Sequence, residues 1–248
     1  MNIAKSIELF PKITLEEMRA VSLMDRVETK FLLSMKDLPG LFQVLHKDYR
    51  VVKIDDQVIL DYRTVYFDTD DFFFYHEHHR KRKDRYKVRF RNYVASELTF
   101  FEVKHKKNGR VEKKRSRVEN EVFQITDDEP LLMESGLEEL DLKHTLSNYY
   151  SRITLVSNHS LERVTIDLDV RFEHEDKEEG LENLVIIELK QETLSRVSPI
   201  YMALKKALIK PYKMSKYCIG LIKTQGIENL KYNRFKKKLL RIEKITRQ

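Results

Sequence analysis

The chain has 248 residues, which suits one large domain with a sizeable core, and a net charge of +7, which favours an anionic partner. Its six glycines form neither G-x-G-x-x-G nor a Walker-type loop, which excludes the usual glycine-rich phosphate cradles. A single cysteine, Cys218, excludes a disulfide scaffold and a cysteine zinc site. Because no apolar run is long enough for a membrane span and Glu8 interrupts any signal-like start, we expect a cytoplasmic protein.

Hydrophobic spacing predicts mixed helices and strands in the first half of the chain. Helices are expected over residues 11–21, with Thr14 as N-cap, over 34–47, and after an N-cap at Asp70 or Asp71. Strands are expected over 24–33, 59–68, 85–93, 98–106 and 111–118. Asn108-Gly109 joins the last two of these strands, which is typical of a tight hairpin.

The second half begins with an acidic, leucine-rich segment that predicts helices over residues 127–146. Strands are expected over 149–157, 162–172 and 184–191, and helices over 198–208, 215–224 and from 228 onward. The sequence therefore predicts an α+β fold: eight or so antiparallel strands in a closed or nearly closed β-barrel with flanking helices. We expect one domain over 1–248, with its core at about 24–225 and a basic amphipathic helix at about 228–246.

Positive charge concentrates between Arg80 and Arg117, where sixteen Lys and Arg residues stand against four acids. Alternation places Arg85, Lys87, Arg89 and Arg91 on one face of a strand. An ordinary half-exposed sheet would turn this face to water. However, like charges side by side destabilise a sheet unless something neutralises them. The alternative is a barrel with a polar interior that holds a polyanion and an apolar exterior covered by helices.

Four further strands show the same alternation. One face carries Arg26, Glu28 and Lys30 on the first strand, and Arg163, Thr165, Asp167 and Asp169 on another. On a third strand, Glu188 and Lys190 share a face, and Glu102, Lys104 and Lys106 do so beside the basic strand. Carboxylates among phosphate-binding cations would repel the ligand unless a metal lay between them, so they favour an enzyme over a simple binding module.

The strand Arg26-Val27-Glu28-Thr29-Lys30 resembles the E-x-E-x-K signature of the triphosphate tunnel metalloenzymes, the CYTH superfamily. The segments Lys87–Arg91, Glu102–Lys104, Ile187–Lys190 and Lys213–Tyr217 together resemble the VTC branch, the polyphosphate polymerase domain of that superfamily. The likeness runs from about Arg26 to Gly220.

This resemblance implies an eight-stranded antiparallel tunnel that binds ATP, and a transfer of its γ-phosphate to a growing polyphosphate chain with a divalent metal, Mn²⁺ or Mg²⁺. By position, it implies catalytic contacts from Lys30, Arg89, Arg91, Lys104, Lys213 and Lys216. Further phosphate contacts are expected from Lys87, Arg115, Arg117, Arg152, Arg163 and Lys190, although the register of Arg115 and Arg117 is open. The metal would be held by Glu188, helped by Glu28 or Glu102.

One departure is Arg26, which stands where the signature has its first Glu and so removes one acidic ligand. This loss favours the polymerase over a two-metal triphosphatase. A metal-dependent triphosphatase and a module that only binds polyphosphate or triphosphate remain the alternatives. A membrane protein is a further candidate partner, and nucleic acid is the weaker one because two of the interleaved aromatics face the apolar side. His76 and His79 could ligate a metal, although a solvated helix end is the simpler interpretation.

Overall fold

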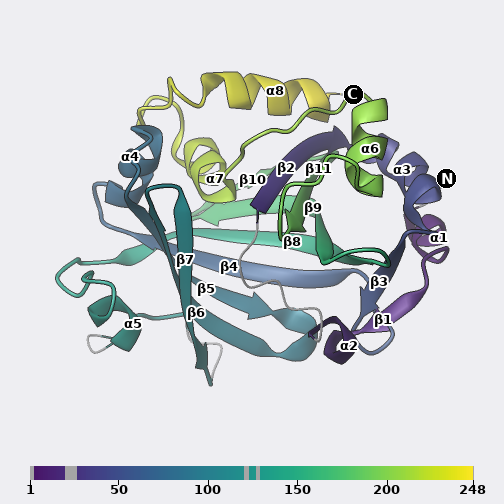
Figure 1. Cartoon of the computed structure of the whole chain (residues 1–248). Helices are drawn as coiled ribbons and strands as arrows, with labels where there is room; N and C mark the ends of the chain where they lie inside the picture. The colour runs from purple at the N-terminus through teal and green to yellow at the C-terminus, as the bar shows by residue number, and fades with distance from the viewer. Residues whose placement is uncertain (1–2, 20–26, 120–122, 127–128, 248) are drawn as a thin grey trace.

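The computed structural model describes residues 3–19, 27–119, 123–126 and 129–247 (Figure 1). Its helices are α1 (Ile3–Ile7), α2 (Leu15–Arg19), α3 (Leu38–Leu45), α4 (Phe73–His79), α5 (Pro130–Met133), α6 (Pro199–Lys206), α7 (Lys216–Gln225) and α8 (Lys236–Thr246), with short 3₁₀ turns at Met35–Asp37 and Val94–Ser96. Its strands are β1 (Lys12–Thr14), β2 (Val27–Ser34), β3 (Tyr49–Lys53), β4 (Leu60–Asp68), β5 (Arg85–Tyr93), β6 (Leu98–Lys107), β7 (Arg110–Val118), β8 (Lys143–Ser157), β9 (Glu162–His174), β10 (Lys177–Gly180) and β11 (Leu184–Gln191).

Eight strands form one hydrogen-bonded path in the order β2-β11-β9-β8-β4-β5-β6-β7. Every pair along this path is antiparallel. The other strands are short additions: β10 pairs with β9, β3 pairs with β8, and β1 pairs in parallel with β3. The molecule is therefore a mostly antiparallel sheet with flanking helices, which confirms the α+β prediction at this level.

A side-chain contact shows that this sheet is strongly curled. Lys104 lies on β6 and Glu28 on β2, six steps apart along the strand order. A flat sheet would separate the two strands by about 29 Å, at about 4.8 Å per step. Nevertheless, Lys104 Nζ lies 3.7 Å from Glu28 Oε2. The sheet therefore bends until the same face of both strands meets across a concave interior, which we call the inner face.

The barrel is not closed by hydrogen bonds in the described part of the chain, where β2 and β7 remain the two edges of the path. The expectation of a closed or nearly closed barrel is thus confirmed for the eight antiparallel strands and for their curvature.

The outer face of the sheet is apolar, as the alternation predicts. Beside β2, β11, β9 and β8 it packs against α1, α3 and α6, where Phe31, Phe42 and Ile200 are fully buried. Beside β4, β5 and β6 it packs against α5, with Phe90 and Phe101 in the centre. Figure 1 shows α3 and α6 at one end of the molecule and α5 at the other. Helices thus cover the apolar face and leave the charged face inside.

Helix α7 covers one end of the inner face. Its fully buried residues include Cys218 and Ile219, and they pack with Leu146 and Phe172 from β8 and β9. The approach is so close that a Cβ on Gly220 would lie 2.4 Å from Phe172 Cδ1. Helix α8 then crosses outside this end (Figure 1). The inner face is therefore apolar where α7 lies and polar beyond it.

Several element predictions for the first half need correction. Residues 12–14 form a strand rather than the start of a helix, although Thr14 does cap α2, since its Oγ1 accepts from Glu17 N at 3.2 Å. Strand β3 is an additional strand. Helix α4 begins at Phe73, because Asp68 rather than Asp70 or Asp71 accepts the N–H groups of its first turn.

In the second half, the helices predicted over 127–146 are wrong beyond α5, because β8 already begins at Lys143. The polar loop through Gly180 contains β10, and the last helix begins at Lys236 rather than 228. The hairpin at Asn108-Gly109 is confirmed, since both residues have positive φ values of 48° and 90°.

Candidate functional site

Strand register brings the predicted site residues of β2, β11 and β9 together on the inner face. Lys30 lies directly opposite Glu188, and Glu28 lies opposite Lys190. Lys190 in turn lies opposite Arg163 on β9. Directly opposed residues share a face of the sheet, so these charged side chains form one continuous patch.

The basic strands β5, β6 and β7 complete the opposite wall. Lys87 faces Lys104, and Arg89 faces Glu102. The register that the sequence left open places Arg115 opposite Glu102 and Arg117 opposite Phe100, so both arginines belong to the inner face. Arg115 also lies over the Phe100 ring, with its Cζ 4.8 Å from the ring centroid.

Glu102 is the central counter-ion of this wall. Its Oε2 lies 2.7 Å from Arg89 Nη2 and 4.0 Å from Arg91 Nη1, and its Oε1 pairs with Lys113. The side chain is 0% exposed. Burial opposes ionisation, but Arg89, Arg91 and Lys113 outweigh it and hold the pKa of Glu102 well below its ordinary range. The carboxylate therefore fixes three cations at one place.

Asp167 has the same role on the other wall, which β8 and β9 form. It accepts from Arg152 Nε at 2.6 Å and Nη2 at 2.9 Å, and it also pairs with Lys216 at the start of α7. Although burial opposes ionisation, Arg152 and Lys216 keep the pKa of Asp167 well below its ordinary range. Lys216 Nζ stands 3.4 Å above the Tyr150 ring. This pairing ties α7 to the sheet and orients two predicted phosphate ligands.

Glu188 and Glu28 are the carboxylates that fit a metal ion. Glu188 pairs with Lys30 and, at 3.0 Å, with Lys190, whereas Glu28 contacts Lys104. The register makes them diagonal neighbours on adjacent strands. No three His, Cys, Asp or Glu side chains of the described chain gather as a ligand set. Mg²⁺ and Mn²⁺ often take one or two protein carboxylates together with phosphate oxygens, so this pair fits such an ion. Glu102 fits it less well, because it is fully buried and already pairs with Arg89, Arg91 and Lys113.

The floor of the inner face contains polar atoms without partners. Asn148, Thr64 and Arg91 are direct neighbours across β8, β4 and β5. Asn148 Oδ1, Thr64 Oγ1 and Arg91 Nε are all buried without a hydrogen-bond partner, as is Thr165 Oγ1 on β9. Buried polar groups are normally satisfied, so this row has the character of a ligand-binding surface.

Burial also affects the lysines of the inner face. It lowers the pKa of Lys87 and of Lys104 to about 8, and the surrounding cations add to this effect. Burial also lowers the pKa of Lys113 to about 8, although the charge of Glu102 partly offsets this effect. For Tyr150, burial acts to raise the pKa, but Arg152, Arg91 and Lys216 outweigh it and lower the pKa to about 8. The site therefore has a shortage of negative charge.

Some predicted residues lie elsewhere. Lys213 is exposed in the segment before α7, near Lys106 rather than on the inner face. Asp169 leaves the face of Asp167, because its positive φ of 50° accompanies a bulge in β9. Arg26, the departure from the E-x-E-x-K signature, lies outside the described residues.

Sequence reasoning missed three contributors: Lys113, Tyr150 and Ser215. Lys113 lies on the same strand face as Arg115, so its alternation could have identified it. Tyr150 and Ser215 have no local signal, because Tyr150 meets Lys216 only in the fold and Ser215 accepts from Lys87 Nζ, at 2.9 Å, only in the fold.

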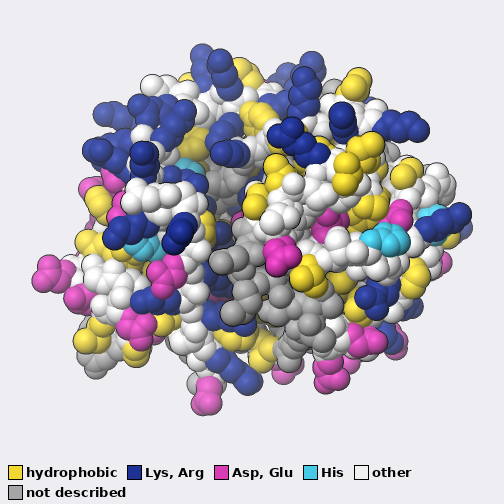
Figure 2. All heavy atoms as spheres, in the orientation of Figure 1, with side chains coloured by type: hydrophobic (Ala, Val, Ile, Leu, Met, Phe, Trp, Pro, Cys, Tyr) yellow, Lys and Arg dark blue, Asp and Glu magenta, His cyan; other side chains and the backbone are white. Residues whose placement is uncertain are grey.

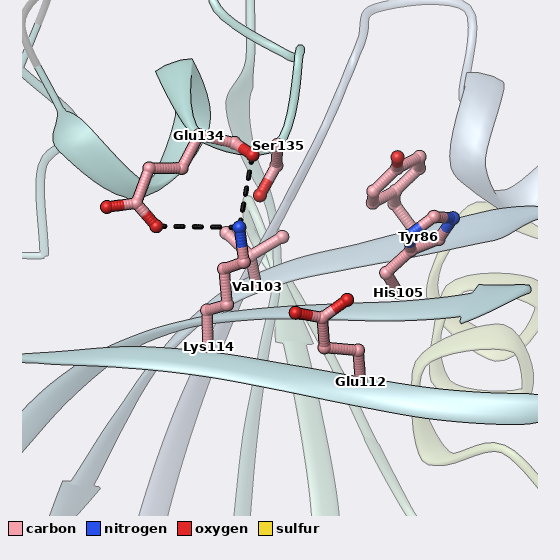
Figure 3. A pocket seen from close by; sticks show the side chains of 7 residues that line it. All are labelled: Tyr86, Val103, His105, Glu112, Lys114, Glu134 and Ser135. Atoms are coloured by element: carbon pink, nitrogen blue, oxygen red, sulfur yellow. Dashed lines mark hydrogen bonds and ion pairs between the residues drawn. The ribbon is translucent and has the colours of Figure 1, made fainter.

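A separate pocket of about 100 Å³ lies on the outer face of β5–β7 beside α5. Figure 3 shows Lys114 directed at Glu134 and His105 stacked on Tyr86, at 4.0 Å between ring centroids. It contains none of the predicted site residues. His79, a candidate metal ligand together with His76, makes a structural contact instead: its Nε2 lies 2.7 Å from Asn233 Oδ1 and its ring packs on Phe235. The inner face is the candidate site.

Known proteins resemble this chain in sequence and in fold. The profile of the VTC domain matches residues 25–224. Among solved structures, a proposed adenylate cyclase from Bacillus halodurans has a TM-score of 0.53 at 17% identity, covering 77% of this chain and 94% of that one. A proposed adenylyl cyclase from Hippeastrum, described as having a dominant triphosphatase activity, has a TM-score of 0.45 at 16% identity, with coverage of 79% and 94%.

A search of curated proteins finds no match. None of the helices in the described ranges is both long and apolar enough to span a lipid bilayer. The family match extends over most of the sequence and includes the strands that carry Glu28, Arg89, Glu102 and Glu188. The chain thus belongs to the VTC domain family.

Proposed function

We propose that this protein is a polyphosphate polymerase, which transfers the γ-phosphate of ATP to the end of an inorganic polyphosphate chain on the inner face. The observation that carries the proposal is the row Asn148, Thr64 and Arg91 within a face rich in Lys and Arg, where Asn148 Oδ1, Thr64 Oγ1 and Arg91 Nε are buried with no hydrogen-bond partner among the described residues. Phosphate oxygens would accept from Arg91 and Thr64 and would neutralise the clustered cations.

The charged residues would divide into holders of phosphate and holders of cations. Arg91, Lys104 and Lys30 would contact phosphate oxygens directly, since their present contacts include only weak or exchangeable ion pairs. Arg89 and Arg152 would be positioned by Glu102 and Asp167, which fix their guanidinium groups from the side. Phosphoryl transfer depends on such positioning and charge neutralisation rather than on a covalent nucleophile.

The reaction needs no dedicated base, because the terminal phosphate of the acceptor chain is already ionised near neutral pH. Its oxygen attacks the γ-phosphorus of ATP, a new P–O–P bond forms, and the bond to the departing ADP oxygen breaks. Glu188 and Glu28 would hold a divalent cation that, when bound, neutralises charge on the phosphate oxygens. Lys30 and Lys190 pair with Glu188, and Lys104 pairs with Glu28, so both carboxylates are held on the inner face.

The test is to incubate purified protein with ATP and Mn²⁺ and to measure ADP and acid-insoluble phosphate. Native protein should form both, and Arg91→Gln should lose most turnover while melting near the native temperature. Arg171→Gln, at an exposed arginine of β9 that pairs with Glu178, is the matched control. ADP with free phosphate and no polymer would contradict the proposal and indicate a triphosphatase.

Glu188→Gln separates a polymerase from a binding module. The amide keeps the shape of the side chain but loses the charge that would hold a cation. We expect metal-dependent turnover to be abolished while tripolyphosphate still binds in the absence of metal, as measured by calorimetry. Turnover at the native rate would make Glu188 a structural ion-pair partner only.

A further inference from the structure

The row of cations on β5 continues past the inner face to the end of the strand at Arg85. Arg85 lies directly opposite Lys106, one alternation beyond the opposed pair Lys87 and Lys104. Burial lowers the pKa of Lys106, and Lys213 lies close enough to lower it further by charge repulsion. Burial, Lys213 and Arg85 act in the same way on the pKa of Lys238 on α8. We call Arg85, Lys106, Lys213 and Lys238 the rim cluster.

The rim cluster differs from the inner face in having no counter-ion. On the inner face, Glu28, Glu102, Asp167 and Glu188 pair with cations. By contrast, no carboxylate within the described ranges forms an ion pair with any member of the rim cluster. Figure 2 shows Lys and Arg side chains gathered along the edge where Figure 1 places α8 and α4. Such an accumulation of like charge favours an anionic ligand.

The rim cluster is nevertheless held in place by the fold. Arg85 Nη1 donates to the Arg82 carbonyl at 2.6 Å, and Lys238 Nζ stands 5.2 Å from the centre of the Phe235 ring. Between them lies His78, whose Nδ1 is buried without a partner and whose electrostatic neighbours are Lys87, Arg85, Lys238 and Lys106. An imidazole surrounded by cations stays neutral and adds a polar group without adding charge.

The length of the basic row indicates the size of the ligand. From Arg91 to Arg85 the strand advances six residues, or about 20 Å at about 3.3 Å per residue. This distance exceeds the length of a triphosphate, which occupies only one part of such a row. A linear polyanion that begins on the inner face and leaves past Lys87 would place its later charges against the rim cluster.

We infer that the rim cluster is a second binding segment for long-chain inorganic polyphosphate, which holds the part of the chain that lies beyond the transfer site. This inference rests on the proposed function, because it assigns the ligand of the same continuous face. It predicts that the protein distinguishes long chains from tripolyphosphate by the rim cluster alone. Lys106 and Lys238 supply this preference, while the contacts of tripolyphosphate stay on the inner face.

The experiment measures the binding of tripolyphosphate and of long-chain polyphosphate by calorimetry, without ATP or metal. The variant is Lys106→Gln/Lys238→Gln, and the matched control is Lys36→Gln/Lys47→Gln, which removes the same charge from exposed lysines elsewhere. We expect the rim variant to bind the long chain about tenfold more weakly, which corresponds to the loss of about one charge-assisted contact. Its affinity for tripolyphosphate should not change. The salt dependence of long-chain binding should also become shallower.

The outcomes separate this inference from the proposed function. If native protein binds no tripolyphosphate, the inner-face site fails. If both ligands bind and the rim variant keeps the native preference for long chains, the rim inference is overturned. Loss of binding to phosphatidylglycerol vesicles with unchanged long-chain binding would also overturn it, because the cluster would then face a lipid surface. An equal loss in the control would show a general charge effect and contradict a local contact.

Discussion

Arg89 and Glu102 face each other across β5 and β6, with two donors of the guanidinium, Nε and Nη2, 2.8 and 2.7 Å from one carboxylate oxygen. This geometry makes Glu102 an internal counter-ion. It explains how a strand with four cations on one face can fold before any ligand arrives. It also separates Glu102 from Glu28 and Glu188, whose lysine partners can give way to a metal.

Glu102→Gln should destabilise the protein by about 3 kcal/mol, since it leaves buried cations without their partner. Because the pKa of Glu102 lies well below its ordinary 4.5 in the fold, its contribution is complete above about pH 4.5 and is lost as the pH falls. Urea unfolding between about pH 3 and about pH 7, in steps of about one pH unit, should show that the stability of the variant depends less on pH at the acid end. Tripolyphosphate should restore much of the lost stability, whereas an unchanged acid slope would contradict this role.

The ligand-free protein should become more stable as the pH rises from about 8 to about 10. In the fold, Lys87, Lys104 and Lys113 have pKa values of about 8, below the ordinary 10.5, so the unfolded chain binds more protons in this window. Tyr150, lowered from 10 to about 8, acts in the same direction. Urea midpoints measured across this window would check the sign.

The affinity for tripolyphosphate should show the opposite trend and fall over the same window. A bound anion favours protonated lysines, so binding should take up protons near pH 8. Calorimetry in two buffers of different ionisation enthalpy measures this uptake. Proton release on binding would contradict placing these lysines beside the phosphates.

The sequence predicted the strands whose local pattern and tertiary setting agree. β5 and β11 have the predicted bounds, because apolar residues alternate with charges for the whole length of β5 and a dense apolar run marks β11. Helices were wrongly predicted over most of 127–146 because the leucines of this segment repeat at helical spacing. In the structure these leucines pack under β6 and β7 mainly from an irregular segment. Its conformation follows from a tertiary contact rather than from local propensity.

The site was predictable to the extent that side chains alternate along strands. Period-two spacing placed Lys30, Arg89, Lys104 and Glu188 on one face, and the register confirms this. Partners could not be predicted, because Asp167 meets Lys216 only through the docking of α7. A bulge at Asp169 likewise has no clear local signal in one sequence.

Tyr217→Phe should destabilise the protein by about 1.5–3 kcal/mol, the range for a hydrogen bond to a charged group. The buried carboxylate of Asp68 accepts from Tyr217 Oη and from the backbone N–H groups of Phe74 and Tyr75, so it joins α7 to the start of α4. A double-mutant cycle with Asp68→Asn should show coupling between the two side chains. Additive effects would show that the hydroxyl and the carboxylate act independently.

Gly220→Ala should cost about 1–3 kcal/mol, because the added methyl would overlap Phe172 and Leu146. Gly40→Ala in α3 is the matched control, since a Cβ there meets nothing within 4 Å. It should stabilise the helix by about 0.5–1 kcal/mol. Thermal unfolding of both variants measures these changes in stability. If Gly220→Ala were no less stable than Gly40→Ala, α7 would be able to shift away from the sheet.

Among the described strands, β7 is an unpaired edge of the sheet, and this affects how copies of the protein behave at high concentration. An open strand edge is a template on which another chain can add a strand and start aggregation. Six of the nine residues of β7 are charged, five of them positive (Arg110, Glu112, Lys113, Lys114, Arg115 and Arg117). Two such edges brought together would repel each other, so the charge that suits this strand to phosphate also keeps the protein from polymerising with itself.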